Sequence, residues 1–449
     1  MKTYEKIVTD LEASIQQGTY LIRERLPSVR QLADRYQCSK STVIKAFDIL
    51  KNKHLIYSVP QIGCYIVENH LKTQPTNTTV IDFSTGNPLM TDLYTPDLKH
   101  CLDRAVDIFS NYNATCHDFY GVDSLRHLLT KYLANFQVFT APPNIFVNLG
   151  ILQALTILTQ MPFPNGKDII LLEQPTYSYY IEYLTRSGAS LLSIRRDHSG
   201  INLDQLETLF KSQKIKFFYT VPRNHNPLGT SYTKAQRKAI AYLAQKYDVY
   251  IVEDDYFGDI SFDKQYDPIF AYGDHCHHIY LKSFIKIIPW LRIGLVTMPT
   301  GLLPLFTQYM RSSYYQSYFA ASLVSQAALE IYIRSNLLHK HASAIKKELA
   351  DRVHSLTPHL TALEKTGAQY CYGNSGMYCF VKLPKTVCET QLITNLKKRN
   401  ILIAPGKPYF INEHDYEKSI RLSVARTPTA AINAGLPEIC SELVRLSQN

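Results

Sequence analysis

The sequence lacks the long apolar run that a membrane helix needs. No stretch of its 449 residues approaches the roughly 20 apolar residues that span a bilayer, and no apolar signal segment opens it. The nine cysteines are odd in number, scattered, and never arranged as C-x-x-C, so neither a disulfide framework nor a zinc site is indicated. There is no internal repeat or low-complexity tract. These absences favour a soluble, cytoplasmic protein without a structural metal.

Length and charge predict several domains, one of them basic. A chain of 449 residues exceeds what one hydrophobic core normally organises. The formal net charge of +10 is only a weak indication of an anionic partner. Residues 23–53, however, hold eight Lys or Arg against three acidic residues, a local excess of five. A nucleic-acid-binding surface is therefore expected in that segment.

Residues 1–69 are predicted to form three amphipathic helices and a β-hairpin. Ser28 can cap the second helix, with Gln31 three residues later completing a capping box, and Ser39 can cap the third. Two β-prone runs follow, on either side of residues 60–63. The segment HLKTQPTNTT (70–79) is polar and aperiodic, so it is predicted to be a short linker. The apolar positions recur at helical spacing and include Ile7, Leu11, Ile15, Val29, Leu32, Ala33, Tyr36, Val43, Ala46, Phe47 and Leu50.

The third predicted helix carries polar and basic side chains opposite its apolar face: Lys40, Ser41, Thr42 and Lys45. A helix-turn-helix presents such side chains to base edges from the start of its second helix, while neighbouring groups hold phosphates. Arg30, near the start of the preceding helix, is expected beside the DNA backbone or a base edge. On periodicity alone, a three-helix bundle that binds no DNA is the alternative.

Three segments, LPSVRQLA (26–33), SKSTVIKAFDIL (39–50) and GCYIV (63–67), resemble the GntR-type winged helix-turn-helix. The resemblance covers nearly all of residues 1–69. It implies contacts with double-stranded DNA from Arg30, Ser39, Ser41 and Thr42, with Gly63 at the tip of the wing.

From Val80 onward, apolar β-prone runs alternate with helical patterns, which predicts a mostly parallel sheet covered by helices. A long helical region is expected at about 302–363. The last 80 residues are expected to form a smaller α+β unit. The clearest β-prone runs are 145–149, 169–172, 217–220, 250–252 and 279–281.

Polar residues beside these runs match the chemistry that pyridoxal phosphate requires. This cofactor needs a lysine for a Schiff base, an acid on its ring nitrogen, donors to its phenolic oxygen and a phosphate site. Lys286 can form the Schiff base, Asp254 can pair with the ring nitrogen, and Asn226 and Tyr256 can share the phenolic oxygen. Asn226, Asp254 and Lys286 all follow β runs, at the edge where open α/β sheets bind ligands.

Further candidates surround this set. Each is weak alone, because a lysine after a strand is usually a surface residue, an acidic turn can cap a helix or bind a metal, and many of the 32 tyrosines only fill space. Backbone N–H groups at a helix start and an arginine both suit phosphate. The candidates are Gly150, Ile151, Leu152, Ser283 and Arg292 for the phosphate, Tyr177 for stacking on the ring, and Arg421 for an effector or substrate carboxylate.

In order and approximate spacing, these segments resemble fold-type I, class I/II aminotransferases over roughly residues 80–445. The segment HDFYGVDSLRHLL (117–129) adds to the resemblance. Two departures from the family's Ser-Phe-Ser-Lys motif leave the phosphate geometry and the role of Arg292 open. Ile285 replaces the second Ser, and the segment from Lys286 to Arg292 is one residue shorter.

A GntR-type head on such a domain resembles the MocR/GabR family of bacterial transcriptional regulators. The resemblance implies a DNA-binding domain at 1–69, a linker at 70–79, and an aminotransferase-like domain at 80–449 with a small C-terminal subdomain at about 340–449. It implies a homodimer. In that family the dimer is usually head-to-tail, with the DNA-binding head of one subunit packed on the large domain of the other, although the linker here is short for that arrangement. The large domain would sense pyridoxal phosphate, an amino compound or their external aldimine, and thereby change DNA affinity.

Two alternatives stay open at this point. One is a working aminotransferase that carries a winged helix, with Lys286 as general base and acid. The other is a repressor whose large domain is an inert scaffold without cofactor.

Overall fold

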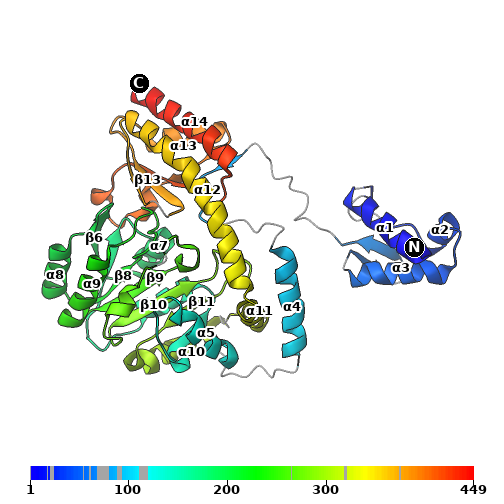
Figure 1. The fold of residues 1–449 in the computed structure, drawn as a ribbon, viewed down its shortest axis with the longest axis horizontal. Helices are drawn as coiled ribbons and strands as arrows, with labels where there is room; N and C mark the ends of the chain where they lie inside the picture. Colours follow the sequence, from blue (N-terminus) through cyan, green and yellow to red (C-terminus); the bar gives the residue numbers. More distant parts are fainter. Residues whose placement is uncertain are drawn as a thin grey trace. The chain divides into compact units, whose positions relative to one another are not determined.

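The computed structural model describes residues 2–17, 19–20, 25–53, 55–59, 62–67, 80–87, 94–110, 120–263, 265–317, 321–373 and 376–448. Its contacts separate two units, Met1–Thr79 and Val80–Asn449, which are described here one at a time (Figure 1). The predicted linker at 70–79, the wing residues 60–61, Arg23 and residues 117–119 lie outside the described residues. No helix in the described ranges is both long and apolar enough to cross a membrane.

The N-terminal unit consists of three helices and an antiparallel hairpin. Its elements are α1 (Thr3–Gln16), α2 (Val29–Arg35), α3 (Lys40–Asn52), β1 (Ile56–Val59) and β2 (Gly63–Ile66). The predicted helix starts are confirmed, because Ser28 and Gln31 form a capping box before α2 and Ser39 accepts a hydrogen bond from the Thr42 backbone N–H. The apolar faces of the helices meet in one small core that includes Leu11 and Leu50.

The large unit is built on an eight-stranded sheet in the order β4-β11-β10-β9-β8-β5-β6-β7. The five strands from β10 to β6 are parallel, whereas β11 is antiparallel to both of its neighbours and β7 is antiparallel to β6. The mostly parallel sheet predicted from the sequence is thus confirmed. The strands are β4 (Ile145–Asn148), β5 (Ile169–Gln174), β6 (Leu191–Asp197), β7 (Gly200–Ile201), β8 (Ile215–Thr220), β9 (Tyr250–Asp255), β10 (His278–Ser283) and β11 (Gly294–Thr297).

Helices cover both faces of this sheet. Consecutive strand residues therefore pack into different cores. Phe217 lies in the larger core, whereas Phe218, the next residue, lies in a second core with side chains of α8 and α9. Both faces of β8, β9 and β10 are buried, which accounts for the apolar run in the middle of each strand. The helices of the sheet region are α4 (Thr95–Phe109), α5 (Asp123–Ala134), α6 (Ile151–Gln160), α7 (Ser178–Ser187), α8 (Leu203–Ser212) and α9 (Lys234–Tyr247).

The predicted long helical region at 302–363 consists of three helices, α10 (Leu303–Ser317), α11 (Leu323–Arg334) and α12 (Leu337–Lys365). Between α11 and α12 the chain turns at Asn336, which has a φ of +56°. The long helix α12 then leads into the C-terminal part of the fold (Figure 1).

The C-terminal part has the α+β character predicted for it. Its sheet has the order β12-β13-β16-β15, and every neighbouring pair is antiparallel. A separate short ladder pairs β3, the first strand after the linker, with β14 in parallel. The elements are β3 (Ile81–Asp82), β12 (Gln369–Tyr372), β13 (Tyr378–Lys382), α13 (Glu389–Lys398), β14 (Ile401–Leu402), β15 (Ala404–Pro405), β16 (Ser419–Ser423) and α14 (Thr429–Ser447).

Candidate functional site

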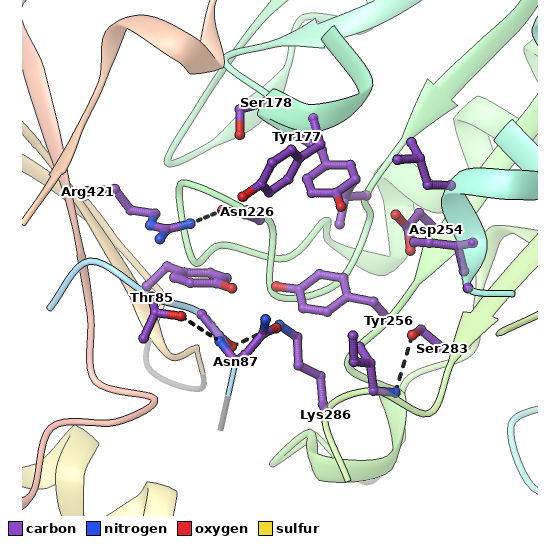
Figure 2. A pocket seen from close by; sticks show the side chains of 18 of the residues that line it. Thr85, Asn87, Tyr177, Ser178, Asn226, Asp254, Tyr256, Ser283, Lys286 and Arg421 are labelled. Carbon is purple, nitrogen blue, oxygen red and sulfur yellow. Dashed lines mark hydrogen bonds between the residues drawn. The ribbon is translucent and has the colours of Figure 1, made fainter. Parts of the chain in front are cut away.

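A cavity of about 680 Å³, called here the central cavity, lies where β8, β9 and β10 end. Its walls come from the loops after these strands, the starts of α6 and α7, and strands of the C-terminal sheet (Figure 2). Every residue that the sequence suggested for the cofactor or effector lines this cavity, so the structure brings the whole set together. They are Gly150, Ile151, Leu152, Tyr177, Asn226, Asp254, Tyr256, Ser283, Lys286, Arg292 and Arg421.

Lys286 lies in the loop between β10 and β11 and is largely buried, with 8% of its surface exposed. Its Nζ donates a hydrogen bond to the backbone carbonyl of Gly86 at 2.9 Å and lies 5.3 Å from the centre of the Tyr256 ring. Ile285, which departs from the usual motif, also lines the cavity, and its backbone N–H donates to Ser283 Oγ at 3.3 Å. The departure therefore leaves the lysine inside the cavity.

Asp254 has an unsatisfied oxygen in the floor of the cavity. Its Oδ2 accepts a hydrogen bond from the Tyr219 hydroxyl at 2.8 Å, whereas its Oδ1 is buried and has no partner among the described residues. Burial raises the pKa of Asp254 to about 7, since it outweighs the opposing effects of Tyr219 and Lys286. A protonated ring nitrogen would supply the missing donor and favour the carboxylate. The donor set thus fits pyridoxal phosphate at this point.

Arg421, on β16, joins the C-terminal sheet to the cavity. One of its guanidinium nitrogens donates to Asn226 Oδ1 at 3.2 Å, and the other donates to the carbonyl of Ser84 (Figure 2). Its Nε is buried without a partner in the described ranges. The guanidinium also lies over the rings of Tyr378 and Tyr409, at 4.7 and 5.4 Å from their centres. A planar cation with a spare donor is suited to a carboxylate.

The two groups predicted to share a phenolic oxygen have other partners here. With its Oδ1 facing Arg421, Asn226 keeps its amide nitrogen as a donor for a ligand. The Tyr256 hydroxyl donates to the backbone carbonyl of Asn224 at 2.5 Å. Tyr256 must therefore redirect its hydroxyl proton before it donates to a ligand.

The phosphate candidates lie around the start of α6. The first backbone N–H groups of a helix have no intrahelical partners, and residues 150–152 at this helix start line the cavity, which suits an anion. Gly294 on β11 allows the close packing here, because a Cβ on it would lie 2.8 Å from the backbone nitrogen of Ile151. No hydrogen bond or ion pair engages the guanidinium of Arg292 within the part of the chain described, so it is available to an anion.

Several lining residues were not found from the sequence. Ser84 and Gly86 contribute backbone carbonyls, which no side-chain pattern reveals, although the turn-forming S-T-G-N after a short β run marks the segment. Tyr219 supports Asp254 from within the apolar run of β8, where it is predicted only as core. Tyr378 and Tyr409 belong to the C-terminal part, like Arg421, and no local pattern singles them out.

The DNA-binding candidates lie on one small unit, with different surroundings. Arg30, Lys40 and Ser41 are exposed, whereas Thr42 is half-buried. The Ser39 hydroxyl lies 2.7 Å from Ser41 Oγ and 2.8 Å from Thr42 Oγ1, so three of the candidates form one cluster of hydroxyls at the start of α3.

Two further candidates have intramolecular contacts. Lys45 Nζ lies 4.3 Å above the Tyr4 ring of α1, so its charge is directed toward that helix. Gly63 has a φ of +147°, and a Cβ on it would lie 2.5 Å from Arg25 Nε, so the wing needs glycine there. Ile44, which the sequence analysis did not select, is 48% exposed on α3 among the polar candidates.

Comparison with known proteins gives two family matches. Residues 78–439 match the model of "Aminotransferase class I and II", and residues 3–66 match that of "Bacterial regulatory proteins, gntR family". A Bacillus subtilis protein named as the uncharacterized HTH-type transcriptional regulator YcxD is 36% identical over 448 residues, which cover 99% of this chain and 100% of that protein. The match thus extends over both units.

Solved structures similar to the chain include aminotransferases. The multiple substrate aminotransferase from Thermococcus profundus has a TM-score of 0.73 and 23% identity, over 83% of this chain and 93% of that one. LysN, the α-aminoadipate aminotransferase from Thermus thermophilus, complexed with N-(5'-phosphopyridoxyl)-L-leucine, has a TM-score of 0.72 and 20% identity, over 82% and 93%. At these identities the likeness shows the fold of the large unit. The chain belongs to the MocR-like family of HTH-type transcriptional regulators, in which a GntR-type DNA-binding domain is fused to an aminotransferase class I and II domain.

Proposed function

We propose that this regulator binds pyridoxal phosphate on Lys286 and changes its hold on operator DNA when an amino compound enters the central cavity. The observation that carries the proposal is the convergence of Lys286, the unpaired Asp254 oxygen and Arg421 in one cavity. An inert scaffold has no need of this set. The regulator is favoured over a working aminotransferase because an enzyme has no need of a DNA-reading helix.

Each part of the cofactor has candidate partners. When bound, pyridoxal phosphate supplies a carbonyl carbon that reacts with primary amines and a ring that withdraws electrons. Lys286 supplies the amine, Asp254 holds a proton on the ring nitrogen, and Tyr177 packs on the ring. The phosphate is held by the backbone of residues 150–152 together with Ser283 and Arg292.

The proposal also covers assembly and location. Helix-turn-helix proteins commonly bind as dimers to two half-sites one helical turn apart. We expect a homodimer in the cytoplasm, on an operator with two related half-sites. The domains are proposed as 1–69 and 80–449, the latter with a small C-terminal subdomain from about 340, joined by a linker at 70–79.

DNA binding is tested with Arg30→Ala. We expect about ten- to hundredfold weaker binding to the promoter region of the protein's own gene, the range for losing an arginine contact to a base, and weaker binding at higher salt. Fluorescence anisotropy with that DNA and with a scrambled duplex measures both. Lys53→Ala is the matched control, because its ammonium is engaged by Glu12 at 2.5 Å. Equal binding to both duplexes, together with rapid transamination, would favour the enzyme instead.

The effector site is tested with Arg421→Gln. We expect L-α-amino acids to bind about tenfold or more weakly, since a charge-assisted hydrogen bond is worth about 1.5–3 kcal/mol, while the affinity for pyridoxal phosphate changes little. Isothermal titration calorimetry measures both affinities. Amines without a carboxylate serve as the control ligands. Unchanged amino-acid affinity in the variant would rule out Arg421 as the carboxylate site.

A further inference from the structure

Behind the central cavity, one buried carboxylate joins segments that carry cavity residues. Glu173 lies near the end of β5, four residues before Tyr177, and its side chain is fully buried. Its Oε1 accepts a hydrogen bond at 2.6 Å from Arg196 on the neighbouring strand β6, whose side chain is also fully buried. Such a pair costs more to desolvate than it gains from attraction alone, unless further hydrogen bonds satisfy it.

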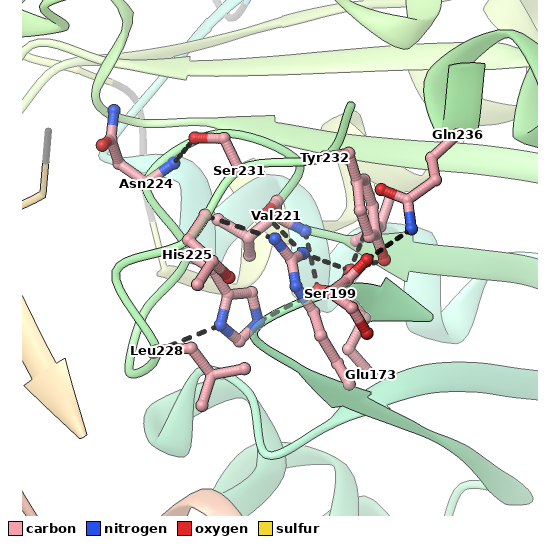
Figure 3. Close-up of polar contacts among 12 residues, drawn as sticks. Glu173, Ser199, Val221, Asn224, His225, Leu228, Ser231, Tyr232 and Gln236 are labelled. Atoms are coloured by element: carbon pink, nitrogen blue, oxygen red, sulfur yellow. Dashed lines mark hydrogen bonds and ion pairs between the residues drawn. The ribbon is translucent and has the colours of Figure 1, made fainter. Parts of the chain in front are cut away.

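Those further hydrogen bonds come from the other neighbour of β5, namely the end of β8 and the loop of residues 221–232 that follows it (Figure 3). Glu173 accepts from Thr220 Oγ1 at 2.6 Å, from the Val221 backbone N–H at 3.0 Å, and from the Tyr232 hydroxyl. Arg196 donates to the carbonyls of Val221 and Thr230 at 2.8 and 3.3 Å. The 221–232 loop is therefore held at its beginning and at its end by the same ion pair.

His225 connects the middle of the loop to the same carboxylate. Its Nε2 lies 3.1 Å from Glu173 Oε2, and the backbone N–H of Leu228 donates to its Nδ1 at 3.4 Å. Burial and the neighbouring Arg196 lower the pKa of His225 to about 4, so the ring is neutral and its one proton belongs on Nε2, toward Glu173. Although burial raises the pKa of Glu173, Arg196 and His225 outweigh it and hold that pKa well below its usual range.

The opposite side of this loop reaches the central cavity. Asn226, next to His225, accepts the hydrogen bond from Arg421. The carbonyl of Asn224 accepts a hydrogen bond from the Tyr256 hydroxyl. The 221–232 loop thus contains Asn226 and contacts Tyr256, the two residues assigned to the cofactor's phenolic oxygen.

We propose that Glu173 is a positioning residue, which with Arg196 and His225 fixes the 221–232 loop and thereby the positions of the Asn226 amide and the Tyr256 hydroxyl beside the phenolic oxygen of the cofactor. The part about the cofactor rests on the proposed function. The part about the loop does not depend on it, because the hydrogen bonds and the ion pair of Glu173 described above join protein groups only. Glu173 touches neither the cavity nor its ligand, and acts through the loop.

The first test needs no cofactor. Glu173→Gln leaves Arg196 buried without its counter-charge, so we expect the backbone amides of residues 221–232 to exchange hydrogen about tenfold faster or more in the cofactor-free full chain. Glu442→Gln is the matched control. Glu442 is also fully buried and paired, with Arg399 at 2.8 Å and Arg445 at 2.6 Å, but on α14. Loop exchange equal in the two variants would overturn the proposal.

The second test uses the visible absorption of bound pyridoxal phosphate. With fewer donors on the phenolic oxygen, its negative charge holds the nearby proton of the Lys286 linkage more firmly, so the pH midpoint of the visible band rises. We expect a rise of about one pH unit in Glu173→Gln, the size of one lost hydrogen bond to a charged group, and none in Glu442→Gln. A wild-type protein that binds no cofactor would refute the proposed function and leave the exchange test to decide this inference.

A double variant separates positioning from general loss of stability. Arg196→Met added to Glu173→Gln removes the uncompensated charge, so stability should recover while the raised pH midpoint stays, because one acceptor oxygen of Glu173 and both Arg196 donations to the loop are still missing. If Glu173→Gln does not fold, Tyr232→Phe removes one donor to Glu173 at nearly constant volume. It should shift loop exchange and pH midpoint in the same directions by a smaller amount. No change in either would overturn the proposal.

Discussion

Lys286→Ala protein should purify without the visible absorption band of covalently bound pyridoxal phosphate. Lys286 is the lysine that lines the central cavity, and the neighbouring Lys282 is directed elsewhere, with its Nζ 3.1 Å from Asp259 and 3.7 Å from the centre of the Phe136 ring. The expected loss of the covalent linkage is complete, because no second lysine among the described residues lines the cavity. Spectra of wild-type and variant protein, recorded after incubation with the cofactor, measure it.

Chemical reduction locates the linkage directly. Borohydride treatment of the wild type followed by peptide mass mapping should place the pyridoxyl group on Lys286. Lys286→Arg is the control that keeps the positive charge and still cannot form the linkage, so it should lack the band while remaining folded. A band that persists in either variant, or a label on another lysine, would refute the assignment. If the cofactor sets DNA affinity, both variants should bind the operator as cofactor-free wild type does.

Asp254→Asn should make the cofactor-free protein more stable at pH 8 and bind pyridoxal phosphate more weakly. Burial raises the pKa of Asp254 to about 7, so the folded chain keeps a proton there that the unfolded chain loses near pH 4. Wild-type stability therefore falls as pH rises through this window, at about 1.4 kcal/mol per pH unit and on the order of 4 kcal/mol in all. Asparagine never ionises, so it avoids this loss and still accepts from Tyr219.

With the cofactor bound, wild-type protein should be the more stable of the two. A protonated ring nitrogen stabilises the carboxylate of Asp254, and asparagine offers no such charge, so the variant should bind the cofactor about ten- to hundredfold more weakly. Denaturant unfolding of the large unit at pH 4.5 and pH 8, with and without pyridoxal phosphate, measures both effects. A variant no more stable than wild type at pH 8 would show that burial does not disfavour the ionised form of Asp254.

The neighbouring residue provides the opposite control. The pKa of Asp255 is lowered, since Arg223 and Lys282 outweigh its burial. Asp255 pairs with Arg223 through Arg223 Nε at 3.0 Å and is buried inside the sheet. Asp255→Asn should therefore destabilise the protein at pH 8, by about 3–5 kcal/mol for a broken buried pair. Two adjacent aspartates should thus respond to the same substitution with opposite signs.

The cavity was predictable from the sequence where its chemistry resides in side chains at strand ends. Lys286, Asp254 and Asn226 lie near the ends of parallel strands, and parallel strands end at one edge, so their meeting follows from the alternation of β runs and helices. The helix caps Ser28 and Ser39 were equally accessible, because capping depends on residues only three apart.

The rest depends on contacts that local patterns do not contain. Every residue of a chain has a backbone carbonyl, so the sequence does not mark those of Ser84 and Gly86. Only the fold shows that they accept hydrogen bonds from Arg421 and Lys286. Glu173 and Arg196 meet across β5 and β6, and no local pattern in the sequence pairs them. Lys45 was assigned to DNA by its helix face, but a long flexible side chain also reaches the ring of Tyr4.

Residues 81–86 are held by contacts of two kinds, some with a strand and some with side chains of the central cavity. At one end, β3 is fixed to β14 by a parallel backbone ladder. A few residues later, the carbonyls of Ser84 and Gly86 are held by Arg421 and Lys286. Under the proposed function, a carboxylate competes for the first of these side chains and the cofactor occupies the second. Ligand binding would then replace the contacts that hold residues 84 and 86.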